Sequence, residues 1–569
     1  MRRLLLAVAI IPVLAYFVFF FSFSLNLPYQ DDYSVLAFAI NFTNPEWPAK
    51  AALFFSQHNE HRIVTLRATA LAFRGLSLEI NWVVIALLGN LGILGIALLL
   101  WKGLTRAGNS PPSAPLAFGF LPVVFLLFQP QHHELTLWAM CAFTNVGAVA
   151  FALLSFRFLT ASPPAPPGFS SVSPSESDRR RLPAVCFAAA AGFGLLSIFT
   201  NGNGLFVLPI GALVLFAAGK RRDFVFWLCA WILIVAFYFL GYVRNPAHPP
   251  ILPFLKGHPL EVGRYFFSSL GSFLDFGTAR SFVPVFAGAV ILAAIIALFV
   301  KRLDRKDPFL SAAILFVGFS IAAQSLTRAP FGATQSLDSR YKFLSALAAA
   351  LVYLGWFRTA RMGKKAVAAA VAAAVAFGAA SFLVNIPRGR ETRTARLSNV
   401  LDWNRGKAAL LYPNSEHADS IMRLAVHRRI YEPPRAWGIV RPAYPFGGIT
   451  TLAAPDSATG TAADAISGWA LDDTGPPEII IRHGPPPPDP PQALDPAKLV
   501  EVGKIACREG TISPFGMIYF GFPGRERMVW EYKRDPPAWS GEAAAAGPPL
   551  FFFARDRDGH ETFLGERRF

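Results

Sequence analysis

The chain has 569 residues, of which 53% are hydrophobic and only 16% are charged, whereas an ordinary soluble domain has about 25% charged residues. This composition excludes a typical soluble cytosolic enzyme. Apolar runs of about 20 residues, long enough to cross a bilayer, recur from the amino terminus to about residue 386 and then stop. We therefore expect a polytopic, mainly α-helical membrane protein with a soluble carboxy-terminal part.

About eleven transmembrane helices are expected in this first part. Trimmed at proline, glycine and charge, the apolar stretches cover residues 4–25, 82–101, 115–128, 136–156, 183–199, 204–219, 224–242, 282–300, 309–327, 343–357 and 366–385. None of them contains Asp, Glu, Lys, Arg or His. Ion-coupled transporters keep such groups at mid-bilayer despite a cost of about 2.5 to 3.5 kcal/mol each, so the sequence disfavours that class of protein.

The net charge of +17 is distributed unevenly among the loops between these stretches. If the amino terminus is cytoplasmic, the inner loops have a net charge of +14, the outer loops +2 and the residues after 386 +1. Positive charge on the inner side is the usual signal of membrane orientation. The basic character therefore predicts topology, with the tail outside, and gives no reason to expect a nucleic-acid partner.

The first predicted outer loop, residues 26–81, begins with two adjacent carboxylates, Asp31 and Asp32, followed by Tyr33. The rest of the loop alternates apolar and polar residues, which predicts two or three amphipathic helices at the membrane interface. Asp32 can simply cap a helix that begins at Tyr33. Alternatively, the pair supplies a general base or a metal ligand.

Two small predicted outer loops hold four of the ten histidines. The first is the segment around His58, Glu60, His61 and Arg62, within the loop 26–81. The second is the short turn after the stretch 115–128, with His132, His133 and Glu134. His58 and His61 can share a helix face and form a metal site with a histidine of the second loop, although no HExxH motif is present. Hydrogen bonding in a polar substrate cleft is the other interpretation.

Three further outer segments carry polar or basic residues. Asn201 lies in the sequence Thr-Asn-Gly-Asn-Gly, which can also be a simple tight turn. Arg264 lies in the loop 243–281, and the entry to the tenth stretch, residues 339–342, is Ser-Arg-Tyr-Lys. Arginine beside tyrosine can anchor a helix at the interface. Arginine also binds phosphate with two hydrogen bonds, and here we expect it at headgroup depth.

These motifs resemble the GT-C superfold of membrane glycosyltransferases, which take a sugar from a polyprenyl-phosphate carrier. Members have a catalytic acid just after the first span, followed by interfacial helices, and Asp31, Asp32 and the loop to residue 81 match that layout. The residues Ser339-Arg340-Tyr341 look like the arginine–tyrosine element that these enzymes place against the carrier phosphate. Where many members have a second acid, this chain has Glu60.

The resemblance implies an inverting glycosyltransferase of the bacterial inner membrane, which moves a hexose or pentose to an extracytoplasmic glycan or lipid acceptor. Asp31, Asp32 and Glu60 are the catalytic candidates. The candidates for substrate binding are Tyr33, His58, His61, Arg62, His132, His133, Glu134, Asn201, Arg264, Arg340, Tyr341 and Lys342. No cofactor is required, and a divalent cation, Mg²⁺ or Mn²⁺, is an option. The alternatives are a lipid or glycan flippase and a non-catalytic component of polysaccharide assembly.

Three regions are expected along the chain. Residues 1–385 form the GT-C-like transmembrane domain, residues 386–446 form a connecting segment with a short helix at 419–431, and residues 447–569 form a periplasmic β-sandwich. The last expectation depends on short strand-like runs between Gly, Pro and Asp residues, at 465–471, 478–482, 517–522 and 550–554.

Overall fold

The computed structural model of the chain describes residues 2–42, 47–76, 78–105, 114–161, 183–244, 249–277, 282–360, 362–404 and 410–433, and eight strands between residues 446 and 567. The chain divides into two compact units. The first, called the helical unit below, comprises Met1–Asp32, Phe54–Leu76 and Asn81–Ser398. The second unit comprises Tyr33–Leu53, Ser77–Ile80 and Asn399–Phe569.

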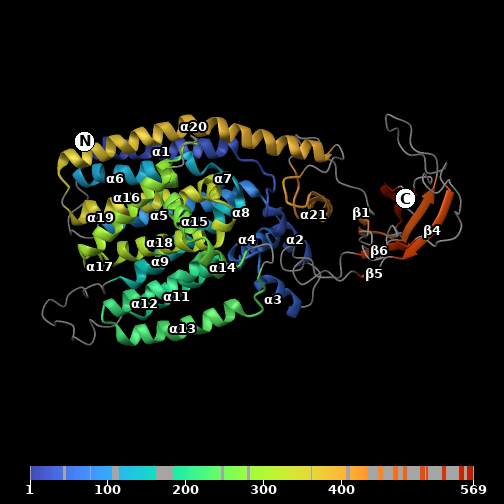
Figure 1. Cartoon of the computed structure of the whole chain (residues 1–569), viewed down its shortest axis with the longest axis horizontal. Helices are drawn as coiled ribbons and strands as arrows, with labels where there is room; N and C mark the ends of the chain where they lie inside the picture. Colours follow the sequence, from blue (N-terminus) through green and yellow to red (C-terminus); the bar gives the residue numbers. More distant parts are fainter. Residues whose placement is uncertain are drawn as a thin grey trace. The chain divides into compact units, whose positions relative to one another are not determined.

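The helical unit is a bundle, in which Figure 1 shows α1 and α20 along one side and α13 along the opposite side. A helix lies at each apolar stretch of the sequence. These helices include α1 (Arg2–Phe23), α5 (Trp82–Thr105), α6 (Ala114–Leu127), α9 (Gly147–Leu159), α11 (Ala184–Ile198), α12 (Val207–Ala217), α13 (Arg221–Phe239), α16 (Phe282–Val300), α18 (Pro308–Arg328), α19 (Lys342–Thr359) and α20 (Lys364–Asn404). A helix satisfies its own backbone polar groups, so an apolar segment of this kind can lie in lipid.

Six helical segments within the described residues are long and apolar enough to cross a membrane: Trp82–Thr105, Ala139–Leu159, Arg221–Phe239, Phe282–Val300, Pro308–Phe331 and Lys364–Trp403. Three apolar helices are shorter, at Val8–Phe23, Ala184–Ile198 and Gly202–Ala217. Many large apolar side chains face outward, such as Leu233, which is 72% exposed. The prediction of a helical membrane protein is confirmed, while the number of eleven spans, the type of membrane and the side of each loop stay predictions.

One close helix contact in the bundle requires glycine. The short helix α8 (Ala139–Cys141) leads into a π-helical segment, η2 (Ala142–Val146), which continues into α9. A Cβ atom on Gly89 of α5 would lie 2.5 Å from the backbone nitrogen of Phe143, so only glycine allows this approach. The adjacent Asn90 is buried and its Nδ2 donates to the backbone oxygen of Thr136 (3.0 Å). These contacts fix the position of η2.

The predicted loop 26–81 contains three helices, α2 (Asp32–Asn41), α3 (Trp47–Phe55) and α4 (Val64–Gly75). The helix α2 differs from the amphipathic helix that we expected, because its residues from Val35 to Ile40 are all buried. Apolar residues occupy every side of this helix, so no face is left for water.

The helix α20 passes the predicted domain boundary at residue 385 and continues through Pro387 to Asn404. The next helix, α21 (Ser415–His427), covers part of the predicted helix at 419–431. Asn414 caps the amino terminus of this helix. Its Oδ1 accepts a hydrogen bond from the backbone nitrogen of His417 (2.9 Å), as is typical of helix amino termini.

Two four-stranded antiparallel sheets follow in the second unit. The first has the order β1 (Phe446–Leu452), β2 (Ala465–Leu471), β6 (Met528–Lys533), β5 (Arg508–Glu509), and the second β4 (Val500–Ala506), β3 (Glu478–His483), β7 (Leu550–Arg555), β8 (Glu561–Arg567). Ile480 pairs with Phe553 in the second sheet. The predicted strand at 517–522 lies outside the described residues. Those residues do not show the sheets closing into a sandwich, which stays a prediction.

Candidate functional site

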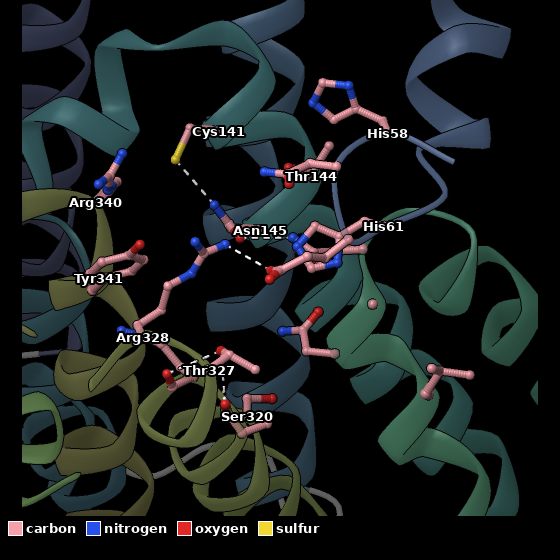
Figure 2. Close-up of a pocket in the computed structure, with 18 of the residues that line it drawn as sticks. His58, His61, Cys141, Thr144, Asn145, Ser320, Thr327, Arg328, Arg340 and Tyr341 are labelled. Atoms are coloured by element: carbon pink, nitrogen blue, oxygen red, sulfur yellow. Dashed lines mark hydrogen bonds and ion pairs between the residues drawn. The ribbon is translucent and has the colours of Figure 1, made fainter. Parts of the chain in front are cut away.

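A cavity of about 620 Å³ lies within the helical unit, in the range of about 300 to 1,000 Å³ that small-molecule sites have. Its walls come from the loop before α2, the turn 57–62, the segment from α7 (His133–Leu137) to η2, the turn η3 (Gly202–Phe206), α18, and η7 (Ser339–Tyr341). Figure 2 shows Arg340 and Tyr341 on one side of this space and His58 and His61 on the opposite side. Segments far apart in sequence therefore meet around one polar space.

Asp31 is the member of the acidic pair that lines the cavity. Its side chain is 27% exposed, and its Oδ2 lies 3.8 Å from the Nε2 of His58. Burial opposes the charge of Asp31, but the nearby His58, Arg340 and Arg328 outweigh it and hold the pKa of Asp31 below its ordinary value. Nearby positive charge has this effect on a carboxyl group. Asp31 is therefore an ionised base beside the cavity.

Asp32 does not line the cavity. Its carboxylate accepts hydrogen bonds from backbone N–H groups instead. Its Oδ2 accepts a hydrogen bond from the N–H of Tyr29 (3.0 Å), and its Oδ1 accepts one from the N–H of Met140 (2.9 Å). The side chain is fully buried. Burial raises the pKa of Asp32 to about 7 despite these two donors. Asp32 thus joins the loop before α2 to the start of α8.

The residues from His58 to His61 form a tight turn and do not share a helix face, which corrects the helical arrangement that we expected. The N–H of His58 donates to the oxygen of His61 (2.6 Å), and the N–H of His61 donates to the oxygen of His58 (2.8 Å). Asn59 adopts a positive φ of 50°, a conformation that asparagine tolerates better than most residues. The turn brings His58, Glu60 and His61 to the cavity.

His61 is the second histidine of this turn that lines the cavity. Burial lowers its pKa to about 4, so the imidazole is neutral at neutral pH. Its Nδ1 is buried and has no hydrogen-bond partner among the described residues. A neutral imidazole can donate or accept a hydrogen bond at this atom, so His61 is suited to an uncharged polar ligand.

Arg62 holds the turn against the end of α13. Its Nε donates to the backbone oxygen of Tyr238 (2.7 Å), and its Nη2 donates to that of Leu240 (2.5 Å). Beside it, the amide of Gln57 donates to the oxygen of Val243 (2.7 Å) and accepts from its nitrogen (2.9 Å). We predicted that Arg62 binds substrate. In the structure its guanidinium donates hydrogen bonds to backbone carbonyls.

Arg340 and Tyr341 line the cavity from η7. The Nη2 of Arg340 lies 2.9 Å from Asp338, and its guanidinium lies 5.1 Å from the ring centre of Tyr341. Burial opposes the charge of Arg340, but Tyr341, Glu134 and Asp338 outweigh it and raise its pKa above the ordinary value. Glu134 lies just outside the cavity lining, where burial raises its pKa. Arg340 is thus a permanent cation at the cavity wall.

The structure brings seven of the predicted residues to one cavity: Asp31, His58, Glu60, His61, Asn201, Arg340 and Tyr341. Eight others are not part of its lining: Asp32, Tyr33, Arg62, His132, His133, Glu134, Arg264 and Lys342. The ring of Tyr33 lies 5.5 Å from that of Tyr412, and Arg264 is exposed.

Besides Asp32 and Arg62, two of these eight residues, His132 and Lys342, have clear structural roles. His132 is fully buried between the rings of Tyr16 and Phe343, at 5.8 and 5.7 Å, and burial lowers its pKa to about 3. The Nζ of Lys342 donates to the Oδ2 (2.9 Å) and the backbone oxygen (2.6 Å) of Asp275. Burial lowers the pKa of His133 to about 4.

Sequence reasoning missed several polar residues of the lining, among them Thr144, Asn145 and Arg328. Asn145 is the only asparagine in the apolar stretch 136–156, and polar residues inside such a stretch are candidates for function because they are costly to place in the membrane. Arg328 follows directly after the ninth stretch and was placed in an outer loop without a role.

The described residues contain no group of three or more His, Cys, Asp or Glu that could hold a metal ion. The predicted option of Mg²⁺ or Mn²⁺ therefore stays a prediction. Comparison of the chain with models of protein families, with curated proteins and with solved structures gave no match.

Proposed function

We propose that the chain is a membrane glycosyltransferase, which transfers a sugar from a polyprenyl-phosphate carrier to an extracytoplasmic glycan or lipid acceptor. The observation that carries the proposal is the cavity that Asp31 shares with Arg340 and Tyr341, inside a bundle of apolar helices. A carboxylate is the base that such a transfer needs, and a guanidinium is the group that stabilises a departing phosphate.

The proposed reaction needs one base and no acid. The acceptor hydroxyl gives its proton to the carboxylate of Asp31 as its oxygen bonds to the anomeric carbon of the sugar. The bond from that carbon to the phosphate oxygen breaks, and its electron pair leaves with the prenyl phosphate, which is stable as an anion. Attack opposite the leaving group inverts the anomeric centre. A positioned general base supplies a factor of about 100 to 10,000 in rate.

Arg340 is suited to hold the carrier phosphate. Its Nε is buried and has no hydrogen-bond partner in the part of the chain that the structure describes. A buried donor without a partner is costly, and a phosphate oxygen is the kind of acceptor that arginine binds best. Tyr341, beside it on the cavity wall, offers a hydroxyl to the same group.

The proposal includes an orientation. The cavity opens toward the outer surface of a bacterial inner membrane, eleven helices span that membrane, and the second unit lies in the periplasm with its two sheets packed as a sandwich. The distribution of charge in the sequence supports it, because the loops on the cytoplasmic side of this arrangement carry a net charge of +14.

The test compares the wild-type protein with Asp31→Asn, both purified in detergent. Farnesyl phosphate is the probe of carrier binding. Turnover is the release of farnesyl phosphate from farnesyl-phosphoryl mannose, glucose, galactose, arabinose or ribose, with membranes of the source cells as acceptor. We expect Asp31→Asn to lose turnover by a factor of about 100 or more while its affinity for farnesyl phosphate stays within about two-fold.

Three results would count against the proposal. Full turnover in Asp31→Asn would remove the base from the mechanism. A wild-type protein that does not bind farnesyl phosphate would exclude a carrier site. Movement of carrier lipid across vesicles without sugar transfer, equal in both proteins, would identify a flippase instead.

A further inference from the structure

Two asparagines form an uncharged part of the cavity wall. The Nδ2 of Asn201 donates to the Oδ1 of Asn145 (2.9 Å), and the Nδ2 of Asn145 donates to the Sγ of Cys141 (3.1 Å). Figure 2 shows Asn145 between Cys141 and His61. A thiol sulfur is only a weak acceptor, so the protein satisfies the amide of Asn145 poorly.

Buried polar atoms without partners belong to other residues of the same cavity lining. The Oδ1 of Asn203, the Nδ1 of His61 and the hydroxyl of Tyr238 belong to residues that line the cavity, and the structure gives them no hydrogen-bond partner among the residues it describes. Native proteins rarely leave such atoms unsatisfied. Three of them beside one cavity indicate a ligand with several hydrogen-bonding groups.

Gly202 packs closely against two of these polar residues. A Cβ atom at residue 202 would lie 2.5 Å from the Nδ1 of His61 and 3.4 Å from the hydroxyl of Tyr238. Any side chain here would clash with the imidazole of His61 and force it to move. Glycine is therefore required at this position, because a Cβ atom would lie too close to His61.

The backbone that carries Asn145 is also unusual. Asn145 lies in the π-helical segment η2, and π-helical turns within α-helices occur frequently at functional sites. Thr144, the preceding residue, lines the cavity too. Two successive polar side chains of this segment therefore line the same cavity.

Two cationic side chains of the cavity have acidic partners. Arg328 pairs with Glu60 at 2.8 Å, and Arg340 pairs with Asp338 at 2.9 Å. The amide wall itself has no formal charge. A sugar hydroxyl can donate to and accept from such amides. A charged group on the ligand would be desolvated here, and the nearest charges, Glu60 and Arg328, are already paired with each other.

From this arrangement we infer that Asn145 and Asn201 bind hydroxyl groups of the donor sugar, and that this sugar is an uncharged hexose or pentose. The inference rests on the proposed function and adds to it the class of sugar and the residues that select it. The two asparagines act in recognition and do not touch the proton that Asp31 accepts.

The test measures how much a sugar adds to the binding of its carrier by the purified full chain. The probes are farnesyl phosphate and its mannosyl, glucosyl, galactosyl, arabinosyl, glucuronyl and 4-amino-4-deoxyarabinosyl derivatives. We expect at least one neutral sugar to tighten binding about 10-fold over farnesyl phosphate. Asn145→Ala and Asn201→Ala should each remove most of this gain and leave farnesyl phosphate binding unchanged.

A further variant replaces Asn145 by a charged side chain of nearly the same size. Asn145→Asp should lose the neutral sugars and bind the cationic 4-amino-4-deoxyarabinosyl lipid best, because the wall then carries a negative charge. Thr394→Ala, at an exposed position on α20, is the control and should leave every affinity as it is. Unchanged binding of farnesyl phosphate shows that each variant is folded.

The outcomes separate the inference from the proposed function. If the wild type does not bind farnesyl phosphate, both are overturned. If it binds farnesyl phosphate but no neutral sugar adds affinity, the inference alone is overturned. The same holds if the glucuronyl lipid binds best, or if both alanine variants keep the full gain.

Discussion

Glu60 and Arg328, which are 268 residues apart in the chain, form an ion pair of 2.8 Å at the cavity. Glu60 comes from the turn 57–62 and Arg328 from the last turn of α18. Both side chains are mostly buried, with exposures of 18% and 20%. A pair shielded from water in this way is sensitive to the loss of either member, so it ties together two walls that come from distant segments.

We expect Glu60→Gln and Arg328→Met each to destabilise the protein by about 1 to 3 kcal/mol, and the double variant to lose less than the sum of the two. Thermal unfolding in detergent measures this as a double-mutant cycle. Asp304→Asn is the matched control, because its pair with Arg302 is 37% and 51% exposed, and exposed pairs contribute little. Strict additivity of Glu60→Gln and Arg328→Met would show that the pair is not coupled.

The helices could be predicted from the sequence, because long apolar runs have few other folds in lipid. The separate roles of Asp31 and Asp32 could not. Their side chains point in different directions, and the choice depends on the N–H of Met140, which is 108 residues away. The adjacent pair indicated a base but left open which carboxylate faces the cavity.

Local backbone geometry explains the other differences from the sequence analysis. The spacing of His58 and His61 suits a helix face, but Asn59 takes a positive φ and turns the chain back. Asn145 lies in a predicted apolar span, and in the structure it lies in a π-helical segment that lines the cavity. Neither conformation follows from hydrophobic periodicity, since both depend on one or two residues and on contacts with distant segments.

The stability of the protein should depend on the ionisation of Asp32. Its pKa is about 7 in the folded chain, against about 3.9 in an unfolded one, so the folded state holds the proton more tightly. Its contribution therefore falls as the pH rises from about 4 through 7. Asp32→Asn cannot ionise, and its unfolding temperature should decline less than that of the wild type between about pH 5 and 8. Parallel curves for the two proteins would contradict the buried position of this group.

The activity should respond to acid through Asp31. Its pKa lies below the ordinary value because His58, Arg340 and Arg328 outweigh the effect of burial, so the base is lost only as the pH falls below about 3.9. His58→Gln removes the first of these three favourable contributions. The acid limb of the pH–rate profile should then move to higher pH, with little change in the plateau rate.

A matched histidine controls for this shift. His258 pairs with Glu261 at 3.2 Å, and both side chains are more than half exposed. His258→Gln should therefore leave the profile where it is. If His58→Gln and His258→Gln give the same acid limb as the wild type, His58 does not assist the base.

The packing of α5 against η2 gives a prediction with an internal control. Gly89 and Gly95 lie in the same helix, but a Cβ at Gly89 would overlap the backbone of Ala142 and Phe143, whereas a Cβ at Gly95 would meet no atom within 4 Å. Gly89→Ala must push η2 away, because backbone atoms cannot move aside as a flexible side chain can. We expect a lower unfolding temperature and a loss of the sugar-dependent binding that Asn145 provides.

Gly95→Ala should be neutral or stabilise the helix by up to about 1 kcal/mol, as alanine generally does relative to glycine. Unfolding temperatures and affinities for the farnesyl-phosphoryl sugars, measured on both variants, distinguish the two glycines. Because Gly89 touches neither Asp31 nor Arg340 in this arrangement, farnesyl phosphate should still bind to any folded Gly89→Ala protein. If that variant were as stable as Gly95→Ala and kept the gain from the sugar, the close approach of α5 would not be what positions Asn145.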